Sequence, residues 1–572
     1  MGVNPTTFAR AATVVITAAA LCTAGPMVAK AHADPTRSTT VAHTAAGKPA
    51  ARDYGTPTRA PGKVCPFVGS VPVQIPLGSL PLGSSLPGRG GVLLPGPSVP
   101  SAIHAELCMT STALTRAETD DPPAVLVLVH GITYGTWYWD LPYQPERYSA
   151  VNSLVRHGYA TLNIDRPGEG RSDHPPSASV TSATNAEVVH QLVQQLHAGR
   201  IGGFSFPHVG LVGHSYGTIT NWGETQRYND TDVNIGTGYS DGVNGLAAGA
   251  FVAQSGPASA SAYWAGQPWA ADPGYLQPTP GTRGVPQLYN KNDADPNVIA
   301  LDEKLANTVT SEELGTFAQN EYDGSRKNIH TPTFLINGER DIMVCGDDAQ
   351  QCATDAGHDA GPRQLEHAAG RLTQWQGASM NPAACFRAAV IPDAGHDINL
   401  HRNAQQLYQT IAYFADQAMG VHGENVDRYR GSCGTSQGIR DVMPTPMMPG
   451  MSMPPSDGLP SVAGAGAPRD RETRSGPEPR FGVRHQTGRI SAVYRNRPRH
   501  ADRLLRRTGW RGTAGSLSSD QQRYLLWKAC GPLPRTHPYV HGAAAPPASR
   551  VVRLLRGAFG IPVRGAGRIT PP

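Results

Sequence analysis

Three polar side chains, each just beyond a short apolar run, have the types and the order that nucleophilic catalysis requires. They are Ser215 after Val209–Val212, Asp341 after Thr333–Ile336 and His396 after Ala388–Ile391. A serine hydroxyl is a weak nucleophile at neutral pH, so it needs an imidazole that accepts its proton and a carboxylate that orients the imidazole. A serine, an acid and a histidine in this chain order, each past its own strand, match one established arrangement of a catalytic triad.

The serine lies in a turn flanked by glycines, Gly213-His214-Ser215-Tyr216-Gly217. A strand that turns sharply into a helix crowds its own backbone, and glycine on either side of the serine relieves that crowding. The turn would present the hydroxyl at a helix N-terminus, where backbone N–H groups favour developing negative charge. Such a five-residue match also arises by chance in a chain with 64 glycines. The match therefore indicates a catalytic serine only together with the apolar run before it and the helix-like segment after it.

A second turn could stabilise the oxyanion of a tetrahedral intermediate. His130-Gly131-Ile132 follows the apolar run Ala124–Val129, and we expect the backbone amides of Ile132 and Tyr216 to form an oxyanion hole. One such donor lowers a reaction barrier by roughly 3 kcal/mol. The loop from Asp165 to Ser172, DRPGEGRS, is interpreted as structural support of the cleft. Its paired glycines lack the third glycine of a dinucleotide fingerprint, and no cofactor is expected.

Apolar runs alternate with helical patterns along the central part of the chain. The expected strands are Ile103–Thr110, Ala124–Val129, Thr161–Ile164, Val209–Val212, Thr333–Ile336 and Ala388–Ile391. The expected helices are Ser149–His157, Gln364–Trp375, Ala404–Met419 and one that begins at the capping box Thr184-Asn185-Ala186-Glu187. This alternation predicts an α/β fold with a doubly wound, mostly parallel sheet, whose chemistry lies at the carboxyl ends of the strands.

Charge divides the 572-residue chain into two unlike parts. Residues 436–572 carry 22 Lys+Arg against 7 Asp+Glu, whereas the preceding part carries 27 against 37. Glycine and proline are frequent but have no Gly-x-x period, which excludes a collagen-like protein. Apolar runs long enough to suggest a polytopic membrane protein are absent. The central part has no basic cluster, so no nucleic-acid partner is expected for the catalytic domain.

The low-complexity basic tail, residues 436–572, admits four interpretations. It could be a disordered arm for anionic surfaces, an envelope-retention segment, a copper(I) site at the methionines of Met443–Pro455, or a coding artefact. Of its 22 basic residues 21 are arginine, and arginine, glycine, proline and alanine are what a GC-rich gene yields when read out of frame. We favour disorder or the artefact.

The N-terminus has the layout of a secretory signal. Arg10 precedes the apolar run Ala11–Ala24, and Ala31-His32-Ala33 places small residues before a cleavage site near Ala33. The apolar run is short and interrupted by Gly25-Pro26, which disfavours a transmembrane anchor. We therefore expect residues 1–33 to be a signal peptide and the mature protein to be secreted.

Export would place the cysteines in an oxidising compartment, where disulfides form. Six of the seven cysteines beyond the signal lie in the acidic part, and they allow 15 pairings. Proximity suggests the pairs Cys65–Cys108, Cys345–Cys352 and Cys385–Cys433. The chain lacks a Cys-x-x-Cys motif, and a His-x-x-x-His spacing occurs only in the basic tail, at His537 and His541, so no metal site is expected.

Three further divisions of the chain follow from composition. Residues 34–100 form a Pro/Gly-rich N-terminal lead, residues 101–435 form the catalytic domain, and residues 242–328 form a cap inserted into it. Aromatic side chains in the cap and after the oxyanion turn suggest an apolar pocket; the candidates are Trp137, Trp139, Trp264 and Trp269. The alternative is that these aromatics form the cap's own core.

From about Ile103 to Gly420 the sequence resembles the α/β-hydrolase superfamily, in particular secreted actinobacterial-type serine hydrolases. The motifs are HGITYGTWYW, DRPGEGRSDHP, GLVGHSYGT, LINGERD and DAGHD. The resemblance implies Ser215 as nucleophile, His396 as base and Asp341 as acid, with Asp241 as an alternative acid and Asp347 as a weaker one. Dehalogenases and epoxide hydrolases of this fold carry aspartate at the position of Ser215, so both are disfavoured.

Three functions remain open. The first is a serine esterase or lipase-like enzyme that cleaves a small-molecule or lipid-like carboxylic ester through an acyl-enzyme. The second is a peptidase or amidase with the same triad, because Ser215-Tyr216-Gly217-Thr218 is similar to the motif of secreted tripeptidyl aminopeptidases; their Asn-Pro-Gly-Gly-Pro-Gly stretch is absent here. The third is an inactive scaffold used for binding. The sequence does not indicate the oligomeric state.

Overall fold

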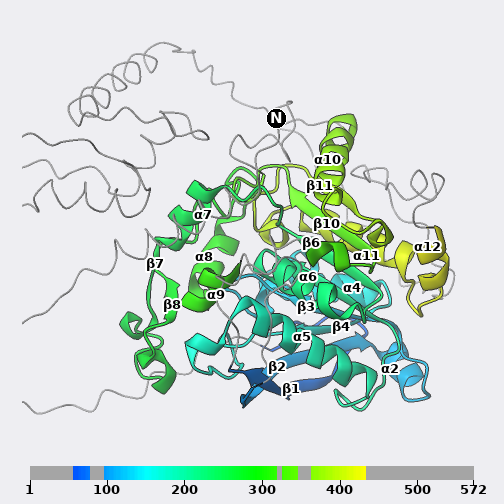
Figure 1. The fold of residues 1–572 in the computed structure, drawn as a ribbon, viewed down its shortest axis with the longest axis horizontal. Coiled ribbons are helices and arrows are strands. Elements are labelled where there is room, and N and C mark those ends of the chain that lie inside the picture. The colour runs from blue at the N-terminus through cyan, green and yellow to red at the C-terminus, as the bar shows by residue number, and fades with distance from the viewer. Residues whose placement is uncertain (1–55, 78–95, 318–324, 346–361, 433–572) are drawn as a thin grey trace, which may run out of the picture. The chain divides into compact units, whose positions relative to one another are not determined.

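The structure of the protein is a computed structural model that describes residues 56–77, 96–317, 325–345 and 362–432. The predicted signal peptide, the basic tail and Asp347 lie outside these ranges. The described chain is built around an eight-stranded sheet in the order β1-β2-β4-β3-β5-β6-β10-β11 (Figure 1). Its strands are β1 (Lys63–Pro76), β2 (Ser98–Thr110), β3 (Val125–Val129), β4 (Ala160–Ile164), β5 (Val209–His214), β6 (Val233–Thr237), β10 (Thr333–Gly338) and β11 (Arg387–Ile391).

Strand direction follows the prediction of a doubly wound, mostly parallel sheet, which is confirmed. β1 pairs antiparallel with β2, and β2 pairs antiparallel with β4. All other neighbours in the sheet are parallel. Each of the six predicted strands overlaps one of the observed strands. The carboxyl ends of β3, β5, β10 and β11 therefore meet at one edge of the sheet, which is where polar turns were expected.

Helices separate and follow these strands. The α-helices are α2 (Ser111–Ala117), α3 (Pro145–Tyr148), α4 (Ala150–Arg156), α5 (Ser182–His197), α6 (Tyr216–Tyr228), α7 (Gly245–Val252), α8 (Pro296–Leu305), α9 (Ser311–Thr316), α10 (Pro362–Gly377), α11 (Ala404–Ala418) and α12 (Val426–Ser432). The 3-10 turns are η1 (Thr136–Tyr138), η2 (Ser177–Ser179), η3 (Ala258–Ala260), η4 (Pro268–Ala271), η6 (Ser325–Asn328), η7 (Pro382–Ala384) and η8 (Ile398–Leu400).

The central strand β3 shows why an unbroken apolar run was read as a buried strand. All five of its residues are buried. Leu126 and Leu128 belong to one hydrophobic cluster with residues of α4 and α11. Val125, Val127 and Val129 belong to a second cluster with residues of α5. Successive side chains point to opposite faces of a strand, so both faces of the sheet are covered and both need apolar residues.

The start of α5 differs from its prediction. The helix begins at Ser182, and its capping box is formed by Thr181 and Thr184. Thr181 has an extended backbone, and its side chain accepts a hydrogen bond from the amide of Thr184. The predicted box of Thr184 with Glu187 is wrong because both residues already lie inside the helix. A cap requires a non-helical residue with a short polar side chain, and Thr181 meets that requirement one turn earlier.

The predicted domain start at residue 101 is also wrong. Residues 63–76, predicted as part of a Pro/Gly-rich lead, form strand β1 of the main sheet. Prolines interrupt the strand pattern here, but β1 is an edge strand and pairs on one side only. An edge strand tolerates proline because one row of its N–H groups has no partner strand. The pairing with β2 also shifts register between Val64 and Phe67, on either side of Pro66.

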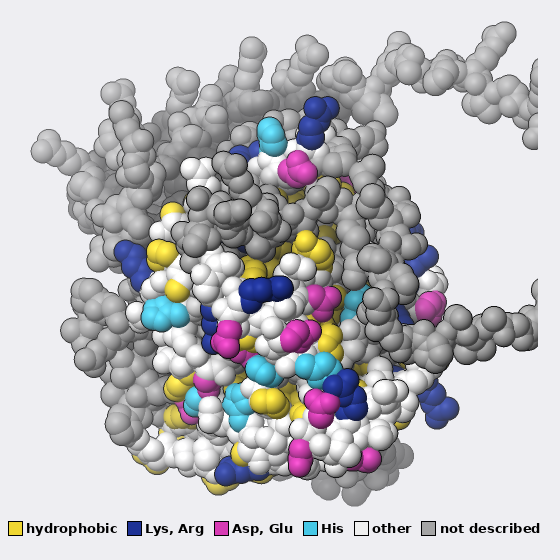
Figure 2. Space-filling view, turned by 90° about the vertical axis from the view of Figure 1, so that its right-hand side faces the viewer, with side chains coloured by type: hydrophobic (Ala, Val, Ile, Leu, Met, Phe, Trp, Pro, Cys, Tyr) yellow, Lys and Arg dark blue, Asp and Glu magenta, His cyan; other side chains and the backbone are white. Residues whose placement is uncertain are grey.

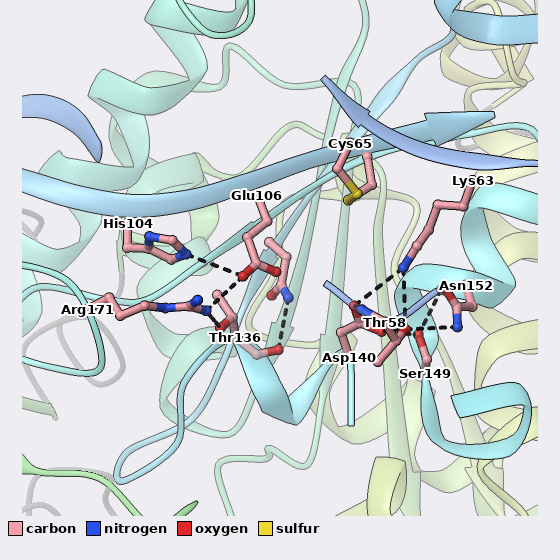
Figure 3. The surroundings of a disulfide bond; sticks show 12 residues. Thr58, Lys63, Cys65, His104, Glu106, Thr136, Asp140, Ser149, Asn152 and Arg171 are labelled. Atoms are coloured by element: carbon pink, nitrogen blue, oxygen red, sulfur yellow. Dashed lines mark hydrogen bonds and ion pairs between the residues drawn. A yellow bond between two sulfur atoms is a disulfide. The ribbon is translucent and has the colours of Figure 1, made fainter. Parts of the chain in front are cut away.

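A disulfide and a buried ion pair fix this first segment to the domain (Figure 3). Cys65 on β1 is bonded to Cys108 on β2, as predicted from proximity. Beside it, Lys63 Nζ lies 3.5 Å from Asp140 Oδ2, which also accepts a 2.8 Å hydrogen bond from the amide of Thr58. Burial lowers the pKa of Lys63, although Asp140 opposes the shift. Cys345 and Cys385 are disulfide-bonded too, but their predicted partners, Cys352 and Cys433, lie outside the described residues.

The chain between β6 and β10 forms the insertion that the sequence predicted as a cap. It contains α7, α8, α9 and a small sheet in the order β7-β8-β9. The strands of that sheet are β7 (Ser255–Pro257), β8 (Tyr275–Pro278) and β9 (Val309–Thr310). In Figure 1 these elements, drawn in green, gather beside the main sheet.

Surface and helix composition give two further observations. Among the described residues, no helix combines the length and the apolar character that crossing a bilayer requires. On the face drawn in Figure 2, acidic, basic and histidine side chains are interspersed over the described part of the surface.

Removal of the Cys65–Cys108 disulfide by a double serine substitution should lower the free energy of unfolding by about 2–4 kcal/mol. The bond closes a segment with a sequence separation of 43. A crosslink of this size lowers the conformational entropy of the unfolded chain, which stabilises the folded state by about 2–4 kcal/mol. Urea unfolding of the Cys65→Ser/Cys108→Ser protein and the wild type measures the difference. An unchanged midpoint would contradict a stabilising role.

Candidate active site

Ser215 occupies a sharp turn between β5 and α6, and its backbone is strained. Its φ of 50° and ψ of −115° lie in a region that non-glycine residues rarely adopt. The flanking glycines have no space for a side chain. A Cβ on Gly213 would lie 2.5 Å from the carbonyl oxygen of Gly217, and one on Gly217 would lie 2.1 Å from that of Val129. The turn therefore depends on glycine at both positions and on its packing against the end of β3.

The structure brings Ser215, His396 and Asp341 together. His396 Nε2 lies 2.9 Å from Ser215 Oγ, and His396 Nδ1 lies 2.8 Å from Asp341 Oδ2. Asp341 is almost fully buried, and its other oxygen accepts hydrogen bonds from the amides of Met343 and Val344. The three side chains come from the ends of β5, β10 and β11, as their position after three strands suggested.

The electrostatics of this arrangement favour proton acceptance by His396. Burial by itself lowers the pKa of His396, but the charge of Asp341 and its hydrogen bond raise it more, so the pKa lies above the usual 6.5. His214, next to the serine, behaves in the opposite way. Burial, with a contribution from His396, holds the pKa of His214 well below its ordinary range. His214 is therefore neutral, and its ring stacks on Tyr138 with centroids 4.4 Å apart.

Of the two alternative acids, Asp241 and Asp347, only Asp241 lies among the described residues. Asp241 forms an ion pair with Arg326 and accepts a 3.2 Å hydrogen bond from the hydroxyl of Tyr239. It contacts these groups instead of His396, so the alternative placement of the acid is not supported. Asp347 lies outside the described residues.

The turn after β3 lies against the serine, as expected for an oxyanion hole. A Cβ on Gly131 would be 3.3 Å from both the Cβ of Ser215 and the carbonyl oxygen of His214. Ile132 follows directly, and Tyr216 is the first residue of α6. Within the described residues neither amide has a backbone acceptor. Amides that have no backbone acceptor in the described part of the chain and lie next to a serine hydroxyl are suited to stabilise an oxyanion.

Arg166 was not predicted as a site residue, yet it fixes the oxyanion turn. Its buried guanidinium donates to the carbonyl oxygens of His130 at 3.1 Å and Gly131 at 3.3 Å. It also pairs with Glu169 at 2.7 Å and with Glu313 of the cap helix α9. The loop that contains Arg166 was interpreted as structural support, and these contacts define what it supports.

The tautomer of His130 follows from the same contacts. The amide of Arg166 donates to His130 Nε2 at 3.1 Å, so the proton of the neutral ring sits on Nδ1, 2.8 Å from the carbonyl oxygen of Gly131. Burial and the neighbouring Arg166 lower the pKa of His130 to about 3. His130 is therefore a neutral donor that shapes the turn.

Cap residues contact both sides of the site. Arg283 Nη1 donates to Thr133 Oγ1 at 2.9 Å, and the amide of Asn307 donates to the carbonyl oxygen of Thr133 at 2.8 Å. On the other side, the amide of Asp397 donates to the carbonyl oxygen of Leu288 at 3.0 Å. The cap is thus hydrogen-bonded to the oxyanion turn and to the loop that carries His396.

A second buried network, also missed by the sequence analysis, lies beside His396. Asp397 accepts a 2.6 Å hydrogen bond from the hydroxyl of Tyr134 and lies 3.4 Å from His214 Nε2. Burial raises the pKa of Asp397. Arg283 lies over the ring of Tyr134 at 4.4 Å and pairs with Asp302 at 2.8 Å. The only available sequence signal was the acid next to the predicted base in DAGHD.

Three of the four tryptophans predicted for a pocket lie inside hydrophobic clusters, and Trp269 packs against one. Trp137 and Trp139 are almost completely buried in the main core, beside Tyr134 and Tyr138. Trp264 belongs to a small cluster within the cap, and the partly buried Trp269 packs against that cluster. This is the alternative that the sequence left open, and it has a simple cause: an inserted segment needs apolar side chains for a core of its own.

Comparison with known proteins agrees with the fold and the order of the motifs. Residues 126–410 match a family model described as the alpha/beta hydrolase family. The chain therefore belongs to the α/β-hydrolase superfamily and has the fold of a hydrolase. No curated protein matches it.

Many solved structures resemble the chain at low sequence identity. An enol-lactonase from Burkholderia xenovorans LB400 is 14% identical, with a TM-score of 0.34, and the alignment covers 54% of this chain and 95% of the enol-lactonase. An esterase from Exiguobacterium antarcticum is 14% identical, with a TM-score of 0.34 and coverage of 55% and 96%. A carboxylesterase structure from Nitrososphaera gargenis is 14% identical, with a TM-score of 0.35 and coverage of 57% and 98%. Likeness at this level identifies no substrate.

Alanine at position 217 should destabilise the protein by about 3 kcal/mol or prevent folding, because its Cβ would overlap the Val129 carbonyl. Gly370 on α10 is the matched control, since a Cβ there meets no heavy atom within 4 Å. Gly370→Ala should instead stabilise by about 0.5–1 kcal/mol through helix propensity. Urea unfolding of both variants tests the pair. Equal stability of Gly217→Ala and the wild type would disprove the tight packing of the turn.

Proposed function

We propose that the protein is a serine hydrolase that cleaves carboxylic esters through an acyl-enzyme on Ser215. The observation that carries the proposal is the continuous hydrogen-bonded series from Ser215 through His396 to Asp341, with contacts of 2.9 and 2.8 Å. A series of this kind lets the imidazole accept the serine proton while the carboxylate stabilises the resulting imidazolium. The strained turn and the two amides beside it supply the remaining parts of the site.

Each step of the reaction uses a group already described. His396 Nε2 takes the proton from Ser215 Oγ as that oxygen attacks the ester carbonyl. The amides of Ile132 and Tyr216 donate to the oxyanion of the tetrahedral intermediate. The intermediate collapses when His396 returns the proton to the leaving alcohol, which leaves an acyl-enzyme. A water molecule, deprotonated by His396, then attacks the acyl group, and Ser215 recovers its proton as the acid is released.

The substrate and the location of the enzyme are further parts of the proposal. The ester is a small-molecule or lipid-like compound, because the catalytic part has no basic cluster in its sequence and the inserted cap is hydrogen-bonded to the turns beside the site. The protein acts outside the cell after removal of residues 1–33. The N-terminal sequence pattern supports secretion, and the disulfide between Cys65 and Cys108 is in keeping with it.

Ser215→Ala should lower kcat/KM for p-nitrophenyl esters by about 10⁴–10⁶-fold, because removal of a triad nucleophile removes the acyl-enzyme route. Labelling by a serine-directed organophosphonate should disappear in the same protein. Ser98→Ala, at an exposed residue of β2, is the control and should keep both the ester turnover and the labelling. Equal ester turnover in Ser215→Ala and the wild type would reject the assignment. Cleavage of aminoacyl anilides with negligible ester turnover would favour the peptidase alternative.

The pH dependence of kcat/KM should follow His396. The base must be neutral to act, and Asp341 raises its pKa above 6.5, so activity should fall as the pH drops through a midpoint above 6.5. In Asp341→Asn the raising charge is absent, so the midpoint should move to lower pH and the rate should fall by roughly 10⁴-fold. Asp241→Asn is the control and should leave the midpoint unchanged. A shift in Asp241→Asn but not in Asp341→Asn would identify the other aspartate as the acid.

A further inference from the structure

Three potential metal ligands converge between helices α5 and α6. They are His190 on α5, Glu224 on α6, and Asp230 two residues beyond the end of α6. The ligand atoms all lie within 4.8 Å of one another. His190 Nδ1 is 2.9 Å from Asp230 Oδ2 and 3.7 Å from Glu224 Oε1. Atoms bound to one small cation at about 2.0–2.2 Å have separations of this order.

Both carboxylates of the cluster have a buried oxygen without a hydrogen-bond partner. These atoms are Glu224 Oε1 and Asp230 Oδ1, whereas His190 Nδ1 forms ion pairs with the two carboxylates. Glu224 is completely buried, and its other oxygen accepts a single 3.1 Å hydrogen bond from the hydroxyl of Thr225. A buried carboxylate with an unpaired oxygen is costly unless a cation or a donor satisfies it. Glu224 directs that oxygen toward His190, at the centre of the cluster.

We propose that His190, Glu224 and Asp230 bind a divalent transition-metal ion, for which zinc is the best match. One imidazole nitrogen and two carboxylate oxygens are a ligand set that zinc takes, with a water molecule at the remaining tetrahedral position. The sequence predicts no metal site here, because the cluster contains no closely spaced cysteines or histidines. This cluster has no such motif: its residues are 34 and 6 positions apart along the chain, and helix packing brings them together.

A protonated His190 between two carboxylates is the competing explanation, and it accounts for less of the geometry. A single Nδ1–H can donate to one acceptor at a time, and Asp230 Oδ2 is the nearer one. Glu224 Oε1, 3.7 Å away, then remains buried without a donor. A cation bound at the centre would contact one ligand atom of each residue and would satisfy Glu224 Oε1.

Neighbouring residues fix the orientation of the proposed ligands. The ring of Tyr228 stacks on the imidazole of His190 with centroids 3.6 Å apart, and the hydroxyl of Tyr228 donates to Glu187. Gln194, one turn beyond His190, donates to Asp230 Oδ2 at 2.7 Å. Outer contacts of this kind orient the ligands of metal sites. A bound ion would link α5 to α6, the helix that begins beside Ser215, and would therefore stabilise the fold.

The test measures zinc binding to the full-length protein after treatment with a chelator. The wild type should bind one equivalent of zinc more than Glu224→Gln does. Zinc alone should also raise the Tm of the wild type but not of that variant. Loss of an outer contact at a metal site costs 10–100-fold in affinity, so loss of the Glu224 charge should cost about 100-fold or more. Cobalt(II) in place of zinc should give visible absorption bands in the wild type that Glu224→Gln lacks.

His208→Asn is the matched control. His208 also faces an aspartate, with Nδ1 3.0 Å from Asp232 Oδ2, but within the described residues no third ligand joins that pair. This variant should keep the zinc equivalent and the rise in Tm. Equal zinc content and equal Tm response in the wild type and Glu224→Gln would overturn the proposal, as would the absence of any zinc-dependent rise in Tm. Zinc binding is read without a substrate, so its outcome is independent of the proposed ester hydrolysis.

Discussion

The hydrogen bond between Ser215 Oγ and His396 Nε2 joins side chains that are 181 positions apart in the chain. It forms because parallel strands end at the same edge of a sheet, so the turns that follow β5, β10 and β11 meet there. The contact also requires the serine to project from a strained turn. That turn exists only because glycines at 213 and 217 allow the backbone of α6 to pack against the end of β3. If that packing were lost, the serine would no longer face the imidazole.

Buried charge connects the rest of the molecule to this contact. Arg166 and Arg283 are both fully buried, and each pairs with an acid contributed by the cap: Glu313 and Asp302, respectively. A buried ion pair gains little stability over an apolar substitute, because desolvation offsets most of the attraction. Here the ion pairs determine the position of the cap relative to the oxyanion turn. Arg166 bonds the carbonyl groups of the oxyanion turn, and Arg283 bonds Thr133, so both arginines tie the cap to the turn next to the serine.

Helix α6 carries residues of both the active site and the proposed metal site. It begins one residue after Ser215 and carries Glu224 near its other end. The two sites differ in kind, because the first places a nucleophile at the helix N-terminus and the second links the side of the helix to α5. The apolar clusters on both faces of the sheet hold these helices in place. The polar groups of the two sites are therefore positioned by apolar residues elsewhere in the chain.

The sequence alone determined six strands of the main sheet, the class of fold and the residues at the strand ends. Runs such as Ala124–Val129 must be buried on both faces, and a glycine-flanked serine after such a run has few structural uses other than a sharp turn. These inferences depend on neighbours along the chain. The order of residues also identified the Cys65–Cys108 pair.

Tertiary structure decided what depends on contacts between distant segments. Prolines did not prevent Lys63–Pro76 from forming a strand, because it lies at the sheet edge. Trp137, Trp139 and Trp264, predicted for a pocket, lie in hydrophobic clusters, and the packing of distant segments determines which apolar side chains are buried together. Arg166, Asp397 and the His190–Glu224–Asp230 cluster also went unrecognised. Their partners lie on other elements, and only the packing of those elements decides which charges meet.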